Sequence, residues 1–207
     1  MIKQNKFFLN KGFTLVEVIV VMGVFSVLIF AITALLVSII QNPKIQLSAM
    51  DSIEQAGSVS FRFANEIRAA AYGTYPLIEA EDSEIIFYSP IGASQGNINR
   101  IRYYISGGVL YKGVIAPVNG FYDDEDETIT PLLSGVSNGA VPLFYYYDET
   151  YNGADYTVPL LQPVYVTRVR YVKMNLVVQY RNTNQDFSTF SISAGSAIRI
   201  LKDNLTN

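Results

Sequence analysis

The chain contains no cysteine and no histidine among its 207 residues. These absences exclude metal sites built from thiolate and imidazole, thiol nucleophiles, and catalytic triads with an imidazole base. They also exclude disulfides, so the fold must rely on its own core, which a chain of this length can build. Acidic residues are absent from the first twelve positions, whereas the remainder has 12 basic and 18 acidic residues, a net charge of −6. Nucleic-acid binding is therefore not expected, because it requires basic side chains that neutralise phosphates.

Charge is almost absent from residues 13–40, where Glu17 is the only ionised side chain. A helix of about 20 apolar residues crosses the hydrocarbon core of a membrane, and positively charged flanks such as residues 1–12 stay in the cytoplasm. The segment is about twice as long as the apolar region of a cleaved secretory signal. A plain uncleaved anchor explains the length and the lysines, but it gives no reason for a carboxylate, which is costly in a membrane.

Residues 41–73 have the pattern of an amphipathic helix. Pro43 lies at its start, and Gly73 and Pro76 are typical stop signals. Apolar or small residues recur every three or four positions, and polar residues such as Arg62 and Glu66 are expected on the other faces. A continuous helix over residues 13–72 would be about 90 Å long at 1.5 Å per residue.

Residues 74–207 form a β-rich globular head with a period of two in place of the helical period. Gly107 and Gly108 separate two alternating runs and predict a hairpin. Strands grouped after a helix indicate an α+β fold, with the helix packed on an antiparallel sheet. The predicted strands are 84–89, 98–105, 109–115, 141–147, 172–181 and 187–193, with a turn at 182–184 and loops at 90–97, 116–140 and 148–163.

The heptapeptide Lys11-Gly12-Phe13-Thr14-Leu15-Val16-Glu17 carries a resemblance. Followed by a long apolar helix, it resembles the class III signal of type IV prepilins and of the pseudopilins of type II secretion. In that family a prepilin peptidase cuts after the position of Gly12 and methylates the new amine, here that of Phe13. The resemblance implies that Glu17 then faces the Phe13 ammonium of a neighbouring subunit and selects the register of the filament.

Further expectations follow from the resemblance. The subunit would stand in the inner membrane in contact with lipid, with its leader in the cytoplasm and its head outside. It would then join sibling pilins or pseudopilins through an inner-membrane assembly platform, in a cell-surface or periplasmic filament. A structural subunit of this kind carries no catalysis and needs no cofactor.

Three departures from the major pilins point to a minor subunit that helps to prime a type IV pilus or a type II secretion pseudopilus. Ala34 stands where major pilins usually have a proline, the disulfide-closed loop cannot form, and the chain left after cleavage is long for a major subunit. The head resembles the J-type minor pseudopilins and W-type minor pilins, in phrases at 101–105, 110–112, 143–148, 169–178 and 198–199.

Other hypotheses remain open for the head. It could instead bind a surface, DNA or an exported substrate, as an accessory pilin does, whereas no motif orients carboxylates for an enzyme. Asp123, Asp124 and Asp126 lie in an acidic run whose carboxylates could hold calcium, although solvated acidic loops are commoner. A second acidic cluster comprises Asp148, Glu149 and Asp155. Four arginines, at 100, 102, 168 and 170, could form a basic face or the solvated side of a sheet.

Overall fold

The computed structural model describes residues 12–94, 96–153, 158–181 and 186–202. The leader up to Lys11 and the predicted turn at 182–184 lie outside the described residues. The chain forms two compact parts, residues 1–45 and residues 46–207, and the second part is called the head below.

A single helix, α1 (Leu15–Arg68), belongs to both parts of the chain. It continues through Pro43, so the predicted segments 13–40 and 41–73 belong to one helix. Its stretch Leu15–Ser38 has a mean hydropathy of 2.8 and no buried side chain, and it is long and apolar enough to cross a membrane.

The prediction that the helix extends to Gly73 is wrong, because α1 ends at Arg68. The last turn tightens, with the Ala70 N–H donating to the Ile67 carbonyl at 3.1 Å. The next amide, that of Ala71, donates to the carbonyl of Tyr88 at 3.1 Å and so leaves the helical path. Burial of Ala70, which is 1% exposed, stabilises this exit toward the sheet.

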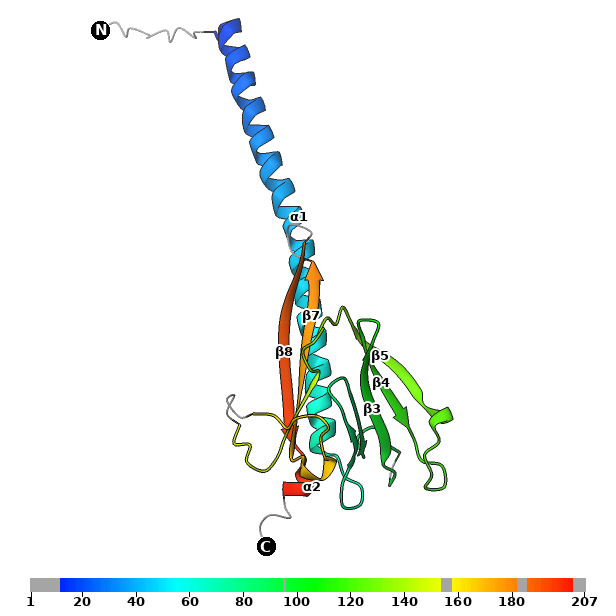
Figure 1. The fold of residues 1–207 in the computed structure, drawn as a ribbon. Coiled ribbons are helices and arrows are strands. Elements are labelled where there is room, and N and C mark those ends of the chain that lie inside the picture. Colours follow the sequence, from blue (N-terminus) through cyan, green and yellow to red (C-terminus); the bar gives the residue numbers. More distant parts are fainter. Residues whose placement is uncertain (1–11, 95, 154–157, 182–185, 203–207) are drawn as a thin grey trace, which may run out of the picture. The chain divides into compact units, whose positions relative to one another are not determined.

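The first sheet of the head is a five-stranded antiparallel meander (Figure 1). The hairpin predicted around Gly107 and Gly108 is confirmed, and both glycines have the positive φ angles (57° and 75°) that a tight hairpin turn requires. The strands, in chain and spatial order, are β1 (Leu77–Ala80), β2 (Glu84–Ser89), β3 (Asn99–Ser106), β4 (Val109–Ile115) and β5 (Thr128–Ser134).

Strand β5 lies inside the predicted loop 116–140, so the sequence missed it. Its first four residues are all exposed, so this part of the strand buries no apolar face. Pro131 lies within it, opposite Tyr111 of β4, and a proline demotes a run to an edge strand. Pairing with β4 therefore creates this strand, rather than its own pattern.

The second sheet has three antiparallel strands, β6 (Phe144–Tyr147), β7 (Tyr171–Arg181) and β8 (Phe187–Ala197), followed by α2 (Arg199–Lys202). The long strand predicted at 172–181 is confirmed, and its partner is longer than the predicted 187–193. The strand predicted at 141–147 begins only at Phe144, because residues 138–141 form a turn closed by the Val141 N–H and the Asn138 carbonyl. The sequence predicts an antiparallel sheet but does not indicate that its strands form two sheets, as they do in the structure.

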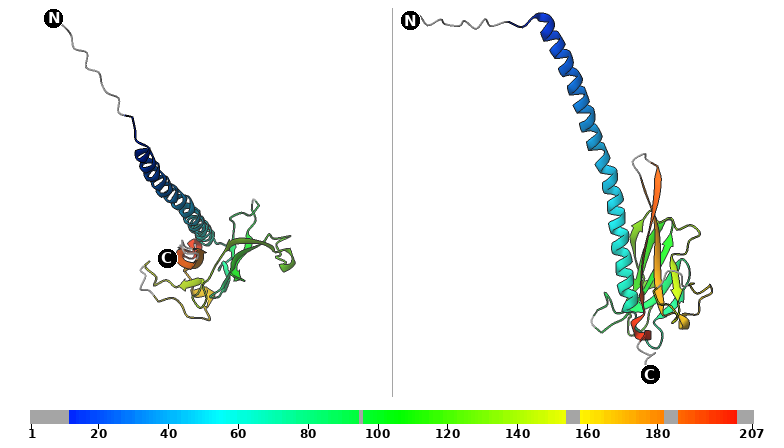
Figure 2. Two further views of the ribbon diagram at one scale, coloured as in Figure 1. Left: turned by 90° about the horizontal axis from the view of Figure 1, so that it is seen from above. Right: turned by 90° about the vertical axis from the view of Figure 1, so that its left-hand side faces the viewer.

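The core of the head lies where α1 meets both sheets. In Figures 1 and 2, β7 and β8 run alongside the part of α1 that belongs to the head. The Phe63 ring of α1 lies 5.3 Å from the Tyr103 ring of β3 and 5.4 Å from the Phe144 ring of β6, between centroids. One fully buried aromatic side chain of the helix thus contacts both sheets.

Candidate assembly site

The side chain of Thr14 caps the start of α1. The Thr14 hydroxyl oxygen accepts a hydrogen bond from the Glu17 N–H at 3.3 Å, and the Thr14 carbonyl accepts one from the Val18 N–H at 3.2 Å. Glu17 occupies the third helical position, where its negative charge also interacts favourably with the helix dipole. The sequence interpretation of Glu17 did not include this local role.

The predicted cleavage point lies just before this cap. Gly12, Phe13 and Thr14 are exposed and outside any helix or strand, and Phe13 is 80% exposed. A peptide bond in such a segment is accessible without unwinding of the helix.

The side chains of residues 12–38 are all exposed within the first part of the chain. Two hydroxyl groups in the helix make local hydrogen bonds, since Ser26 donates to the Met22 carbonyl and Thr33 donates to the Ile29 carbonyl, both at 2.8 Å. Apart from Glu17, the surface that remains is mainly apolar on every side, as in a helix that lies in lipid or among other helices.

The comparison with known protein families gives a match that includes this apolar segment. A family described as the prokaryotic N-terminal methylation motif matches residues 8–40. No curated protein matches the chain.

This motif marks a precursor of the type IV pilin or pseudopilin class. It implies processing by a prepilin peptidase and assembly with other pilins, and it indicates a structural subunit. The apolar helix Leu15–Ser38 is consistent with membrane anchoring of such a protein.

The head holds a buried ionic cluster that the sequence did not reveal. Glu66 of α1, expected on a polar face, is only 3% exposed, so that prediction is wrong. Its carboxylate oxygens accept hydrogen bonds from the Tyr103 hydroxyl at 2.8 Å and from the Lys112 ammonium at 2.5 Å. Burial, followed by the adjacent Glu66 carboxylate, raises the pKa of Tyr103 far above its ordinary value. The sequence did contain one indication of this burial. Glu66 follows Phe63 by three positions, so both side chains lie on the apolar face of the helix.

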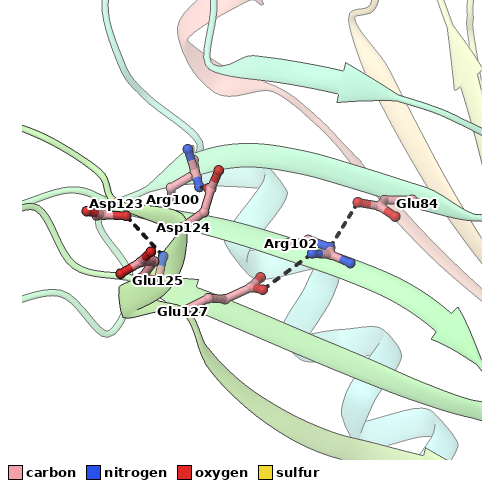
Figure 3. Close-up of polar contacts among 7 residues, drawn as sticks. All are labelled: Glu84, Arg100, Arg102, Asp123, Asp124, Glu125 and Glu127. Atoms are coloured by element: carbon pink, nitrogen blue, oxygen red, sulfur yellow. Dashed lines mark hydrogen bonds and ion pairs between the residues drawn. The ribbon is translucent and has the colours of Figure 1, made fainter.

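The acidic run folds back onto the arginines of β3, as Figure 3 shows. Asp123 caps the short 3₁₀ helix η1 (Asp124–Asp126) by accepting a hydrogen bond from the Glu125 N–H at 3.1 Å. Asp124 pairs with Arg100. Glu127 pairs with Arg102 at 3.3 Å. The run therefore covers one end of the outer face of the sheet.

Arg102 is held from both sides, since its second partner is Glu84 of β2 at 2.9 Å (Figure 3). Burial raises the pKa of Glu84, against the lowering effect of Arg102. Gly113 of β4 lies beneath the Glu127 carboxylate, where a Cβ would stand 1.8 Å from its Oε1 atom. The glycine therefore makes room for this ion pair.

The acidic run is expected to be a solvated loop, and calcium at Asp123, Asp124 and Asp126 stays an untested alternative. Within the described residues, no group of three or more acidic side chains is arranged to hold a metal ion. In the second acidic cluster, Asp148 accepts hydrogen bonds from Thr150 and pairs with Arg168 at 3.0 Å. The Thr150 hydrogen bonds, followed by Arg168, lower the pKa of Asp148; Asp155 lies outside the described residues.

The four arginines do not come together as one basic face among the described residues. Arg100, Arg102 and Arg168 each pair with a carboxylate. Arg170 donates instead to the carbonyls of Thr167 at 2.7 Å and Val169 at 3.1 Å. Carboxylates thus compensate the charge of three of these arginines, and the fourth donates hydrogen bonds to backbone carbonyls.

Proposed function

We propose that this chain is a minor pilin or pseudopilin that is cleaved between Gly12 and Phe13 and methylated on the Phe13 amine. It then waits in the inner membrane with its head outside until an assembly platform adds it to a filament. In that filament, a type IV pilus or a type II secretion pseudopilus, it helps to prime assembly alongside sibling subunits.

The observation that carries the proposal is the apolar helix Leu15–Ser38, which begins at a capped turn and has no buried side chain. A surface of this kind needs lipid before assembly and the helices of other subunits afterwards. Cleavage after Gly12 would place a new ammonium group two residues before the start of the helix.

The role proposed for Glu17 is to pair with the Phe13 ammonium of a neighbour. Two unit charges about 4 Å apart attract each other by about 4 kcal/mol at an effective dielectric constant near 20, before the cost of desolvation. A misaligned subunit would leave both charges without a partner in an apolar surrounding. The pair therefore favours one axial register over others.

The minor role is supported by features outside the motif. The long mature chain has a head with two sheets and no disulfide, and Ala34 replaces the usual proline of major subunits. The phrases that resemble J-type and W-type subunits fall on strands, since residues 101–105 lie in β3 and residues 169–178 lie largely in β7.

The decisive experiment replaces Glu17 by Gln in the full chain. The cap uses the backbone N–H of residue 17, so this change removes the charge and keeps the cap. We expect normal cleavage, measured as the mature size on a gel, together with reduced recovery in sheared filaments. The matched control is Thr14→Ala, which weakens the cap and keeps the charge. Normal incorporation of Glu17→Gln would remove the assigned role of the carboxylate.

A second candidate function is ligand binding by the head. The observation in its favour is a cluster of three tyrosine rings beside Arg100: Tyr72 and Tyr88 lie 4.2 Å apart, and Tyr88 and Tyr122 lie 5.0 Å apart. Tyr72 is 42% exposed, so its ring is available for stacking on a ligand. In this case Tyr72→Ala would impair surface attachment, DNA uptake or secretion while filament number stays normal.

A further inference from the structure

Strand β8 is an edge of the second sheet. The strands lie in the order β6, β7 and β8, and no strand among the described residues pairs with the side of β8 that faces away from β7. This side is called the open edge below. The register of β8 with β7 is uninterrupted over the 11 residues of each strand. In Figures 1 and 2 β8 lies beside the part of α1 that belongs to the head.

The pairing with β7 determines which backbone groups face the open edge. The Ile198 N–H donates to the carbonyl of Arg170, which lies opposite it, at 3.0 Å. In an antiparallel pair, positions that are hydrogen-bonded to the partner strand alternate with positions that are not. The even-numbered residues of β8 therefore bond to β7. The N–H and carbonyl groups of Thr189, Ser191 and Ser193 point to the open edge, and all three residues are exposed.

Strand β8 lacks the features that usually protect an edge. Residues 187–197 contain neither a charged residue nor a proline. In contrast, the edge strand β5 of the first sheet contains Pro131, which has no N–H to donate to an added strand. Natural proteins protect an edge with charge, proline or a bulge, or they cover it. A long edge without such protection is therefore expected to be covered by another chain.

An apolar stripe of α1 lies next to β8. Gly57 faces the strand, since a Cβ atom on this glycine would lie 3.7 Å from the Ile192 Cδ1 atom. Met50, Ile53 and Phe61 lie seven or four positions away from the glycine, so they share its face of the helix. They are 65%, 45% and 68% exposed, in this order. The head thus leaves these three apolar side chains uncovered beside the open edge.

These two surfaces define the chemistry of a strand that could be added. The side chains of a strand point alternately to its two faces. On one face they would lie over the apolar stripe of α1, which apolar residues would cover. On the other face they would lie beside the side chains of Thr189, Ser191 and Ser193, which suit serine or threonine. The fitting segment therefore alternates apolar and small polar residues.

A second copy of this chain fits the edge poorly. β8 runs in the same direction as α1, because Ile192 lies near Gly57 and the later Ser196 accepts a hydrogen bond from the Arg68 Nε atom at 3.2 Å. An antiparallel pair of two β8 strands would direct the two α1 helices in opposite directions, whereas copies anchored in one membrane share a direction. A parallel pair would turn the serine and threonine face of the second β8 toward the apolar stripe.

We propose that the open edge of β8 and the apolar stripe of α1 together bind an extended segment of another protein by strand addition. Main-chain hydrogen bonds to Thr189, Ser191 and Ser193 hold the added strand, and the stripe selects its alternate side chains. The inference goes beyond the proposed filament function. It is tested without cleavage or filament assembly, so its failure would leave that function standing.

The probe is a fluorescent peptide of about nine residues that alternates valine and threonine, with lysines at both ends for solubility. A control peptide has the same composition with its valines consecutive. Both are titrated into the full chain in detergent, and amide hydrogen exchange is followed by NMR. We expect exchange to slow by about tenfold or more at Thr189, Ser191 and Ser193. The amides of Phe190 and Ile192, which already bond to β7, should change little.

This alternating protection distinguishes strand addition from other modes of binding. Absence of binding, equal affinity for the control peptide, or binding without protection of the three outward amides would each overturn the proposal. Protection that appears without peptide and rises with protein concentration would assign the edge to a second copy, and it would overturn the proposal as well.

Two variants test the two surfaces separately. Ser191→Pro removes one outward N–H and keeps the bonds to β7, and it should weaken peptide binding by about tenfold or more. Phe61→Ser removes an exposed side chain of the stripe and should weaken binding by about tenfold. The matched control is Leu161→Ser, which removes an 84% exposed apolar side chain outside this surface and should bind normally. Thermal unfolding verifies that each variant is folded. Equal affinity of Phe61→Ser and Leu161→Ser would overturn the proposal.

Discussion

Glu66 of α1 and Lys112 of β4 form an ion pair inside the head, with 2.5 Å between the carboxylate and ammonium groups. The side chains are 3% and 13% exposed, and the Tyr103 hydroxyl donates to the second carboxylate oxygen. If one member of a buried ion pair is removed, the other charge stays buried without a partner. We therefore expect Glu66→Gln and Lys112→Met each to lower the free energy of unfolding by about 3–5 kcal/mol.

The double variant Glu66→Leu/Lys112→Met should recover only part of that loss, because two apolar side chains leave no buried charge but the buried Tyr103 hydroxyl loses its acceptor. Denaturant unfolding of the full chain in detergent measures all of these variants. The control is Arg168→Met, which breaks the Asp148 pair where Arg168 is 60% exposed and should cost no more than about 1 kcal/mol. Equal costs for Lys112→Met and Arg168→Met would contradict the importance of burial.

Gly195 of β8 has no room for a side chain. A Cβ there would stand 2.5 Å from the Val172 carbonyl oxygen and 2.8 Å from the Lys173 Cα. These atoms are backbone and cannot move away cheaply, so Gly195→Ala should destabilise the head by about 1–3 kcal/mol.

Gly57 of α1 provides the matched control, since a Cβ there would lie 3.7 Å from the Ile192 Cδ1 atom, an ordinary contact. Alanine favours the helix over glycine, so Gly57→Ala should leave the protein unchanged or stabilise it by up to about 1 kcal/mol. Thermal unfolding distinguishes the two variants, and a destabilised Gly57→Ala would show that the helix packs more tightly there.

Two buried phenols make the stability of the head sensitive to alkali. Burial is the main cause that raises the pKa of Tyr103 and of Tyr146 above the ordinary value near 10. Because the unfolded chain releases these protons first, their contribution is complete below about pH 10 and is lost as the pH rises further. Tyr103→Phe should reduce this slope by about 1.4 kcal/mol per pH unit. A slope unchanged in the variant would show that Tyr103 does not remain protonated.

The acidic run at 123–127 should not depend on calcium. Asp123 caps η1 and Asp124 pairs with Arg100, so both carboxylates already have partners. We expect the same Tm in calcium and in chelator. A Tm that rises with calcium, and that loses this rise in Asp126→Asn, would establish the alternative of a calcium site.

We expect processing to depend on Gly12, the small residue before the predicted cut. Gly12→Val places a branched side chain at the position that the peptidase is expected to recognise. A Cβ atom at this position would have no other atom within 4 Å, so the substitution is not expected to disturb folding. We expect the variant to keep the full precursor size on a gel, whereas Gly23→Ala in the apolar helix should mature normally. A mature product from Gly12→Val would exclude this cleavage point.

Local patterns were sufficient for several elements. The hairpin of β3 and β4 follows from alternation on both sides of Gly107 and Gly108, which supply the turn. The strand at 172–181 follows from five apolar residues on one face. The apolar helix and the methylation motif depend only on neighbouring residues, so the sequence was enough to predict them, although the helix begins at Leu15 rather than at Phe13.

Only the tertiary structure decided how the head is arranged. β5 has no strand pattern of its own and exists through β4, and Glu66 is buried because Lys112, 46 positions away, neutralises it. The arginines of β3 meet carboxylates from a loop and from β2. A sequence shows what each segment prefers locally. Which charges become buried, and which edge is left beside α1, depends on contacts between distant segments that form only when the chain folds.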